Sequence, residues 1–180
     1  STMSTQTIEQ PQLYFPGIDN YFNNKGNRLL TIAANHEGSI TASTHVKSNH
    51  IKDCSGENLI AALYELSTCY NENTKGNKAL AQYPVEKDHM GTLIREVPWV
   101  SLYASKEKGS DPVTAEYRLG VEIPFAFMES TAETFSEAFS NLEKVVINPQ
   151  VIRSHIVFES MLGSLDTFGI QHTFNPEILE

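Results

Sequence analysis

Two segments of this chain alternate less polar with more polar residues at a period of two, and a helical period follows them. The first segment covers residues 40–47, and the second covers residues 117–125, after a strand-like segment at 99–104. This alternation is typical of strands with one buried and one solvated face. Since neighbouring strands of this kind pair as hairpins, the pattern predicts an antiparallel sheet with an N-terminal hairpin and a meander.

The period then changes to that of an amphipathic helix. Over residues 135–146, apolar side chains recur at spacings of three and four. Asn148-Pro149 predicts the end of this helix and the start of a second one, with apolar positions from Val151 to Leu162. A further helix is expected at residues 56–70, inserted between the hairpins. Strands followed by two C-terminal helices predict an α+β fold.

The remaining segments are assigned by their polarity and turn residues. Residues 1–12 predict a flexible arm, and residues 71–91 a long loop or insertion. Pro16-Gly17 indicates a turn, after a possible short strand at residues 12–15. A length of 180 residues fits a single domain spanning residues 1–180.

The charge of the chain is acidic and unevenly distributed. The formal net charge is −9, which argues against a general nucleic-acid binder, since such domains are usually basic. Residues 129–180 contain eight acidic and two basic residues, so we expect an acidic helical side. The chain contains no apolar run long enough for a membrane span, and its first residues lack the pattern of a signal peptide.

Few residues form a pattern typical of catalysis. His45, His50, Asp53 and Cys54 are possible metal ligands, but their spacing matches no zinc motif. Cys54 and Cys69 are interpreted as reduced thiols. No nucleophile, phosphate-loop or metalloprotease motif is present, so we expect no enzyme, no cofactor and no bound metal.

The solvated face of the predicted sheet is the more informative candidate site. Hydroxyls, aromatic rings and scattered bases on one sheet face can bond phosphates and stack on bases. The residues expected on this RNA-facing face are Thr41, Ser43, His45, Lys47, Trp99, Ser101, Tyr103, Glu116 and Arg118.

The strand Tyr117–Phe125, the cap Ser130–Glu133, the helix Phe135–Val146 and the continuation through Asn148-Pro149 resemble part of a known family. They are similar to the last strand and two C-terminal helices of coat proteins of small single-stranded RNA bacteriophages. The match covers roughly residues 97–162.

That resemblance implies an interlocked dimer, in which the helices of each subunit lie across the partner's sheet. Dimers would close into an icosahedral shell around single-stranded genomic RNA, assembled in the cytoplasm of the bacterial host and found in the virion. No membrane partner is expected. The dimer interface is predicted to contain Phe135, Phe139, Leu142, Ile152 and Ile156.

Two other functions remain open from the sequence. An acidic dimeric binding module, similar to a secretion chaperone that holds an unfolded client, fits the small size and low pI of about 5.1. A small enzyme dependent on a metal or a thiol would use His45, His50 or Cys54.

Overall fold

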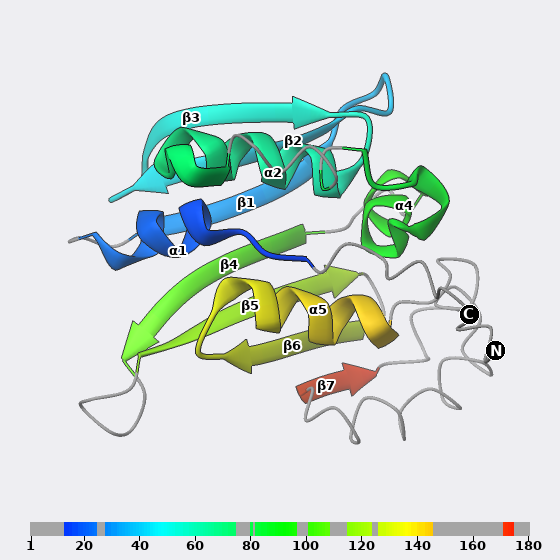
Figure 1. Cartoon of the computed structure of the whole chain (residues 1–180). Helices are drawn as coiled ribbons and strands as arrows, with labels where there is room; N and C mark the ends of the chain where they lie inside the picture. The colour runs from blue at the N-terminus through cyan, green and yellow to red at the C-terminus, as the bar shows by residue number, and fades with distance from the viewer. Residues whose placement is uncertain are drawn as a thin grey trace, which may run out of the picture.

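A computed structural model of the chain places a seven-stranded antiparallel sheet under a layer of helices (Figure 1). The structure describes residues 13–24, 28–74, 80, 82–96, 101–108, 115–123, 126–145 and 171–174. The strands are β1 (Arg28–Ala34), β2 (Ile40–Val46), β3 (Asn49–Gly56), β4 (Ser101–Lys108), β5 (Ala115–Ile123), β6 (Ala126–Ala132) and β7 (Gln171–Phe174). The helices are α1 (Pro16–Asn23), α2 (Leu59–Tyr70), α4 (His89–Glu96) and α5 (Phe135–Val145), with 3-10 turns η1 (Glu72–Thr74) and η2 (Val85–Lys87). The predicted α+β class with an antiparallel sheet is confirmed.

The sheet is built from two units of the same element order. Three antiparallel strands and a helix occur first as β1-β2-β3-α2 and again as β4-β5-β6-α5. The strand order β3-β2-β1-β4-β5-β6-β7 places β1 and β4 side by side and antiparallel at the centre. The two units therefore extend outwards from this central pair in opposite directions, as a two-fold arrangement requires.

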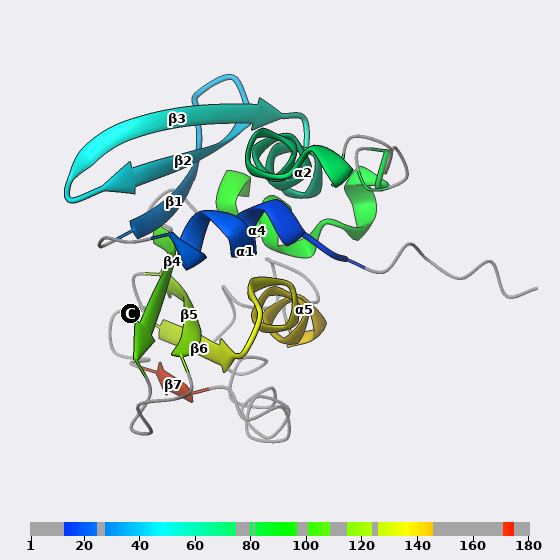
Figure 2. The same cartoon turned by 60° about the vertical axis from the view of Figure 1, so that its left-hand side comes forward.

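The helices α1, α2 and α5 cover one face of the sheet (Figure 2). Helix α1 lies between the other two and joins them. The backbone N–H of Phe15 donates to Oγ of Ser136 in α5 at 2.7 Å, and that of Gly17 donates to Oγ of Ser67 in α2 at 2.8 Å. A Cβ atom at Gly17 would lie 1.7 Å from the carbonyl oxygen of Ser67, so only glycine allows this close approach.

The apolar stripe of α5 packs inside this single chain. Phe135, Phe139 and Leu142 are fully buried. The rings of Phe135 and Phe139 each lie edge-on to the ring of Phe15, with their centroids 6.0 and 5.8 Å from its centroid. The sequence prediction assigned Phe135, Phe139 and Leu142 to a dimer interface, whereas the structure places them in the intramolecular core. The physical reason is the packing of Phe15, the residue just before α1, against both rings within the same chain. Ile152 and Ile156, with the predicted second C-terminal helix, lie outside the described residues.

Several element predictions need correction. The Pro16-Gly17 segment begins a helix instead of a turn, since Pro is well suited to the first helical position. Helix α2 begins at Leu59, because Asn58 caps it through a bond to the N–H of Ala61 and residues 55–56 belong to β3. The predicted loop at 71–91 contains η1, η2 and the start of α4. Strands β3, β6 and β7 were not predicted.

Among the described residues, no helix is both long and apolar enough to cross a membrane. The predicted flexible arm at residues 1–12 lies outside the described part of the chain.

Candidate functional site

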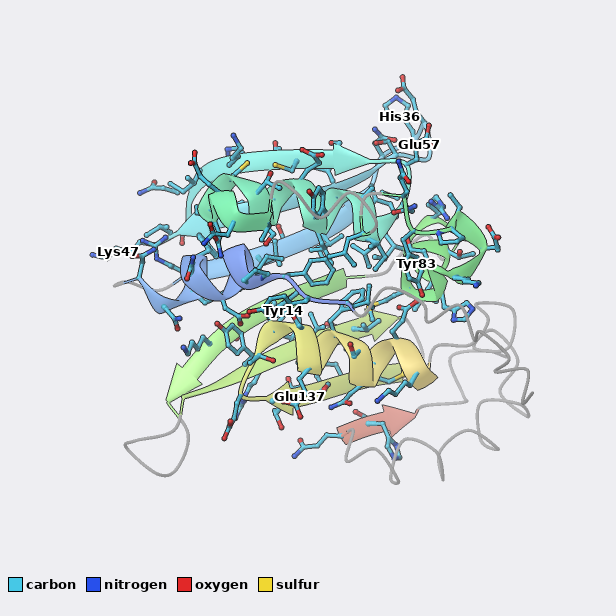
Figure 3. The ribbon with its side chains drawn as sticks, viewed as in Figure 1. Tyr14, His36, Lys47, Glu57, Tyr83 and Glu137 are labelled. Atoms are coloured by element: carbon cyan, nitrogen blue, oxygen red, sulfur yellow. The ribbon has the colours of Figure 1, made fainter. Side chains whose placement is uncertain are left out.

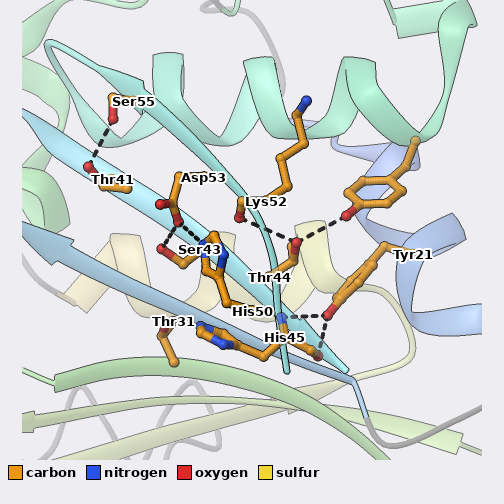
Figure 4. Close-up of polar contacts among 11 residues, drawn as sticks. Tyr21, Thr31, Thr41, Ser43, Thr44, His45, His50, Lys52, Asp53 and Ser55 are labelled. Carbon is orange, nitrogen blue, oxygen red and sulfur yellow. Dashed lines mark hydrogen bonds and ion pairs between the residues drawn. The ribbon is translucent and has the colours of Figure 1, made fainter. Parts of the chain in front are cut away.

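The face of the sheet opposite the helices is polar, and its side chains bond to one another across the strands (Figure 4). The hydroxyls of Thr41 and Ser55 lie 2.9 Å apart, and Oγ of Ser43 donates to Oδ1 of Asp53 at 2.5 Å. Thr31 contacts Nε2 of His45 at 3.2 Å. The expected placement of Thr41, Ser43 and His45 on one face is therefore found, with neighbours from β1 and β3.

His50 and Asp53 form an ion pair on this face. Nε2 of His50 lies 2.7 Å from Oδ1 of Asp53. The hydrogen bond from Ser43, followed by the bond with His50, holds the pKa of Asp53 below its ordinary value. The carboxylate is therefore already bonded, and no group of three or more possible metal ligands occurs among the described residues.

Cys54 lies apart from these histidines. It pairs in register with buried Ala42, and its Sγ is 3.9 Å from Sγ of Cys69 in α2. Burial, and secondly the neighbouring Cys69, raises the pKa of Cys54 to about 12. The four possible metal ligands found in the sequence are therefore divided between the two faces of the sheet.

Tyr103 lies across the central part of the open face. Its ring occupies the space beside Gly120, where a Cβ atom would come within 2.4 Å of the ring. Its hydroxyl donates to Oε2 of Glu129 at 3.1 Å. Burial, and secondly the bond to Glu129, raises the pKa of Tyr103 to about 12. The ring is thus held against the sheet by its neighbours.

The other predicted residues of this face are described to different extents. Arg118 is exposed on β5, in register with Ser105 of β4. Ser101 and Glu116 belong to β4 and β5, and the structure describes only their backbone. Trp99 lies outside the described residues.

A cleft of about 660 Å³ lies at one end of the sheet, and its lining is basic. His45 and Lys47 line it, as the sequence placed them together. Arg28, Ser48 and Lys106 also line it and were missed, because they come from the ends of β1 and β4 and from a turn. Figure 3 shows Lys47 at one end of the molecule and Tyr83 towards the other. Only the pairing of β1 with both β2 and β4 brings these bases together.

The turn on the rim of this cleft has an unusual backbone. Lys47 and Ser48 join β2 to β3 with positive φ angles of 50° and 68°. Positive φ at both central residues is a feature of the type I′ hairpin turn, which strongly prefers Asn-Gly. The left-handed conformation costs roughly 1–2 kcal/mol for a residue with a Cβ atom. The chain therefore keeps a lysine and a serine where other residues would fold more easily.

The outer edge of the sheet is a second exposed feature. Strand β3 is eight residues long and has β2 as its one neighbour among the described strands. Most of its residues are exposed, including Ile51 at 54%. An edge strand presents unpaired N–H and C=O groups that can pair with another chain.

No family model, curated protein or solved structure matches this chain significantly. The functional argument therefore rests on the geometry of the open face, the basic cleft and the edge strand.

Proposed function

We propose that this protein is an acidic, dimeric binding module, similar to a secretion chaperone, that holds an extended segment of a client polypeptide. The observation that supports this function best is the exposed edge strand β3. An extended peptide can add to such an edge, where main-chain hydrogen bonds give affinity with little dependence on sequence.

The side chains of β3 suit reversible binding. Ile51 supplies an exposed apolar contact, while Lys52 and Asp53 place both signs of charge on the same strand. Charged residues on an edge strand limit uncontrolled sheet extension between folded copies. The edge can thus accept a flexible client without promoting aggregation of the protein itself.

The closed core also supports a binding module. Helices α1, α2 and α5 cover one sheet face within one chain, and the apolar stripe of α5 is already buried. One chain therefore completes its own core without helices from a partner. The net charge of −9 favours partners with basic segments over nucleic acids.

The test uses reduced, carboxamidomethylated lysozyme, a basic chain that stays unfolded, as the client. We expect the protein to bind the labelled client in fluorescence anisotropy, and Ile51→Asp to weaken that binding. Val85→Asp is the matched control, because Val85 is 43% exposed on η2 and outside the edge. Circular dichroism of both variants checks the fold. Equal binding by both variants, or no binding by the native protein, would overturn the proposal.

The polar open face supports a second candidate, the coat-protein function. Hydroxyls, His45, Tyr103 and Arg118 share a face that the described helices leave uncovered. In this proposal the interlocked dimer and the icosahedral shell enclose single-stranded RNA, and the predicted second C-terminal helix contributes to the dimer. The assembled shell would form in the bacterial host and be released as a virion.

Light scattering coupled to size-exclusion chromatography separates the two functions. The binding module predicts a dimer near twice 20.1 kDa, with or without added RNA. The coat protein predicts uniform hollow particles with nucleic-acid absorbance in electron microscopy. For such particles, Arg118→Ala would lower the amount of packaged RNA without preventing shell formation.

A further inference from the structure

We propose that the basic cleft at the β2–β3 turn binds a small molecule that carries several phosphate groups. The cleft is defined by Arg28, Thr31, His45, Lys47, Ser48 and Lys106, with Leu29 and Ser105 completing its lining. This site differs from the client-binding edge of β3, because side chains form the cleft whereas the edge binds through backbone groups.

The charge of the cleft contrasts with that of the whole protein. The chain contains 22 acidic and 13 basic residues, yet the described residues that line the cleft include none that is acidic. Three cationic residues, Arg28, Lys47 and Lys106, are among the residues that line this cleft. Asp53, an acidic residue of the open face, is already paired with His50. Gathering like charges on an acidic protein favours an anionic ligand.

Two of the bases are held in place by aromatic rings. The Arg28 guanidinium lies over the ring of Tyr21 at 5.0 Å, and Nζ of Lys106 lies over the ring of Tyr117 at 5.1 Å. Lys106 also donates a hydrogen bond to Oδ1 of Asn23. Because Asn23 and Tyr117 are uncharged, these contacts orient the Lys106 ammonium without neutralising it.

Tyr21 links the two strands whose ends line the cleft. Its hydroxyl lies 2.7 Å from the carbonyl oxygen of His45 and 3.0 Å from that of Leu29, and it accepts a bond from the N–H of His45 at 3.1 Å. This one side chain joins the ends of β1 and β2 from the helix side, and Figure 4 shows its two bonds with His45. The bases therefore sit on a rigid support, which lowers the entropic cost of ligand binding.

The turn at Lys47 and Ser48 points to the same function. Left-handed backbone at residues with a Cβ atom tends to occur at functional sites, where the surrounding structure maintains it. Here the turn places a lysine and a serine on the rim of the cleft. An Asn-Gly pair would adopt this left-handed backbone at lower energy, but it would remove the ammonium of Lys47 and the hydroxyl of Ser48.

The size and donor set indicate the class of ligand. A volume of about 660 Å³ is in the ordinary range for pockets that hold small molecules. Arg28 and Lys106 reach the cleft from the helix side, while Thr31 and Ser105 line it from the open side. Together with Lys47 and Ser48 on the turn, these cationic and hydroxyl groups match the many acceptor oxygens and multiple charges of a polyphosphate. A single carboxylate would leave most of these donors unused. The confinement of the bases to one end of the sheet favours a compact ligand over a nucleic-acid strand.

Isothermal titration calorimetry with inorganic tripolyphosphate at constant ionic strength tests the proposal. We expect saturable binding, weakened by about tenfold or more in Lys47→Glu, since a charge-assisted contact becomes repulsive. Lys52→Glu is the matched control: it makes the same change in net charge on exposed β3, outside the cleft, and should bind as the native protein does. Lys106→Gln gives a second variant if Lys47→Glu does not fold.

Further titrations distinguish the ligands that share this chemistry. Binding of adenosine triphosphate with similar affinity would identify a nucleotide-type ligand, and binding of tripolyphosphate alone would identify a polyphosphate; both support the proposal. Equal loss in the Lys47 and Lys52 variants would overturn it, since the effect would then be one of net charge. Tighter binding of a single-stranded RNA oligonucleotide than of tripolyphosphate would also overturn it, in favour of a nucleic-acid surface.

Discussion

Asp88 and Glu143 bind the same helical turn from two sides. Oδ1 of Asp88 accepts from the N–H of Gly91 at 3.1 Å, and Glu143 accepts from the N–H groups of His89 and Met90 at 2.8 and 3.2 Å. The second oxygen of Asp88 accepts from the N–H of Leu59, the first residue of α2. The two carboxyl groups therefore join α2, α4 and α5 by satisfying the free N–H groups at helix starts.

This relationship predicts a stability that falls as pH rises. Burial, and secondly the charge of Asp88, raises the pKa of Glu143 from 4.5 to about 8. The Glu143 carboxyl group holds its proton more tightly in the folded state than in the unfolded state. Its contribution to the free energy of unfolding is therefore fully present below about pH 4.5 and is lost as pH rises through 8. We expect the midpoint of thermal unfolding to decrease between pH 5 and 8.5.

Glu143→Gln removes this titration and keeps the size of the side chain. We expect the variant to lose much of the decrease in unfolding midpoint between these pH values, since one amide oxygen still accepts from the first turn of α4. A decrease as steep as that of the native protein would show that Glu143 is not the responsible group.

The packing of Phe139 against Phe15 predicts a large effect on the stability of one chain. Phe139→Ala should lower the free energy of unfolding by about 3–5 kcal/mol, measured by urea denaturation, because it leaves a cavity between α1 and α5. Val85→Ala, at an exposed site, should change it by less than about 0.5 kcal/mol. Unchanged stability with loss of a dimer would instead place Phe139 between subunits, as the sequence prediction had it.

The turn at Lys47 and Ser48 predicts a conflict between folding and binding. Replacing both residues, Lys47→Asn with Ser48→Gly, should raise the free energy of unfolding by about 1 kcal/mol, because Asn and Gly adopt the left-handed conformation more easily. The same variant should lose affinity for tripolyphosphate in calorimetry. A gain in stability with full affinity would show that the turn residues are not part of the binding site.

The neighbouring thiols predict an intramolecular disulfide under oxidation. Cys54 and Cys69 lie 3.9 Å apart, and a disulfide requires about 2 Å between sulfur atoms. Hydrogen peroxide would take one proton and one electron from each thiol and be reduced to two molecules of water, so the intact mass should fall by two hydrogen atoms.

Peptide mapping after oxidation should identify a Cys54–Cys69 link within one chain. We expect the reaction to be faster at alkaline pH, since burial leaves little Cys54 thiolate near neutrality. Cys54→Ser is the control and should show no loss of mass from this link. Covalent dimers as the main product would contradict the intramolecular geometry.

Local patterns in the sequence were sufficient for much of the fold. The period-two alternation over residues 40–47 and 117–125 identified strands β2 and β5 and the solvated side of each. The apolar spacing at 135–146 predicted α5 to within one residue. These features depend on side-chain periodicity along one element, which is readable without the rest of the molecule.

Other elements lack such a signal. Strand β3 is exposed along most of its length, so no buried side alternates with a solvated one. Helix α1 is eight residues long, and Pro16-Gly17 has the chemistry of a turn as much as that of a helix start. Its helical state depends on contacts with α2 and α5, which lie far away in the chain.

The α+β class, the alternating faces and the position of His45 on the solvated side of β2 can be read from the sequence alone. The packing of α5 on Phe15 of its own chain, and the cleft that Arg28 and Lys106 line with His45 and Lys47, depend on the three-dimensional arrangement of the elements. The reason is physical: periodicity records which side of an element is buried, whereas the partner that buries it is chosen by long-range packing and strand register.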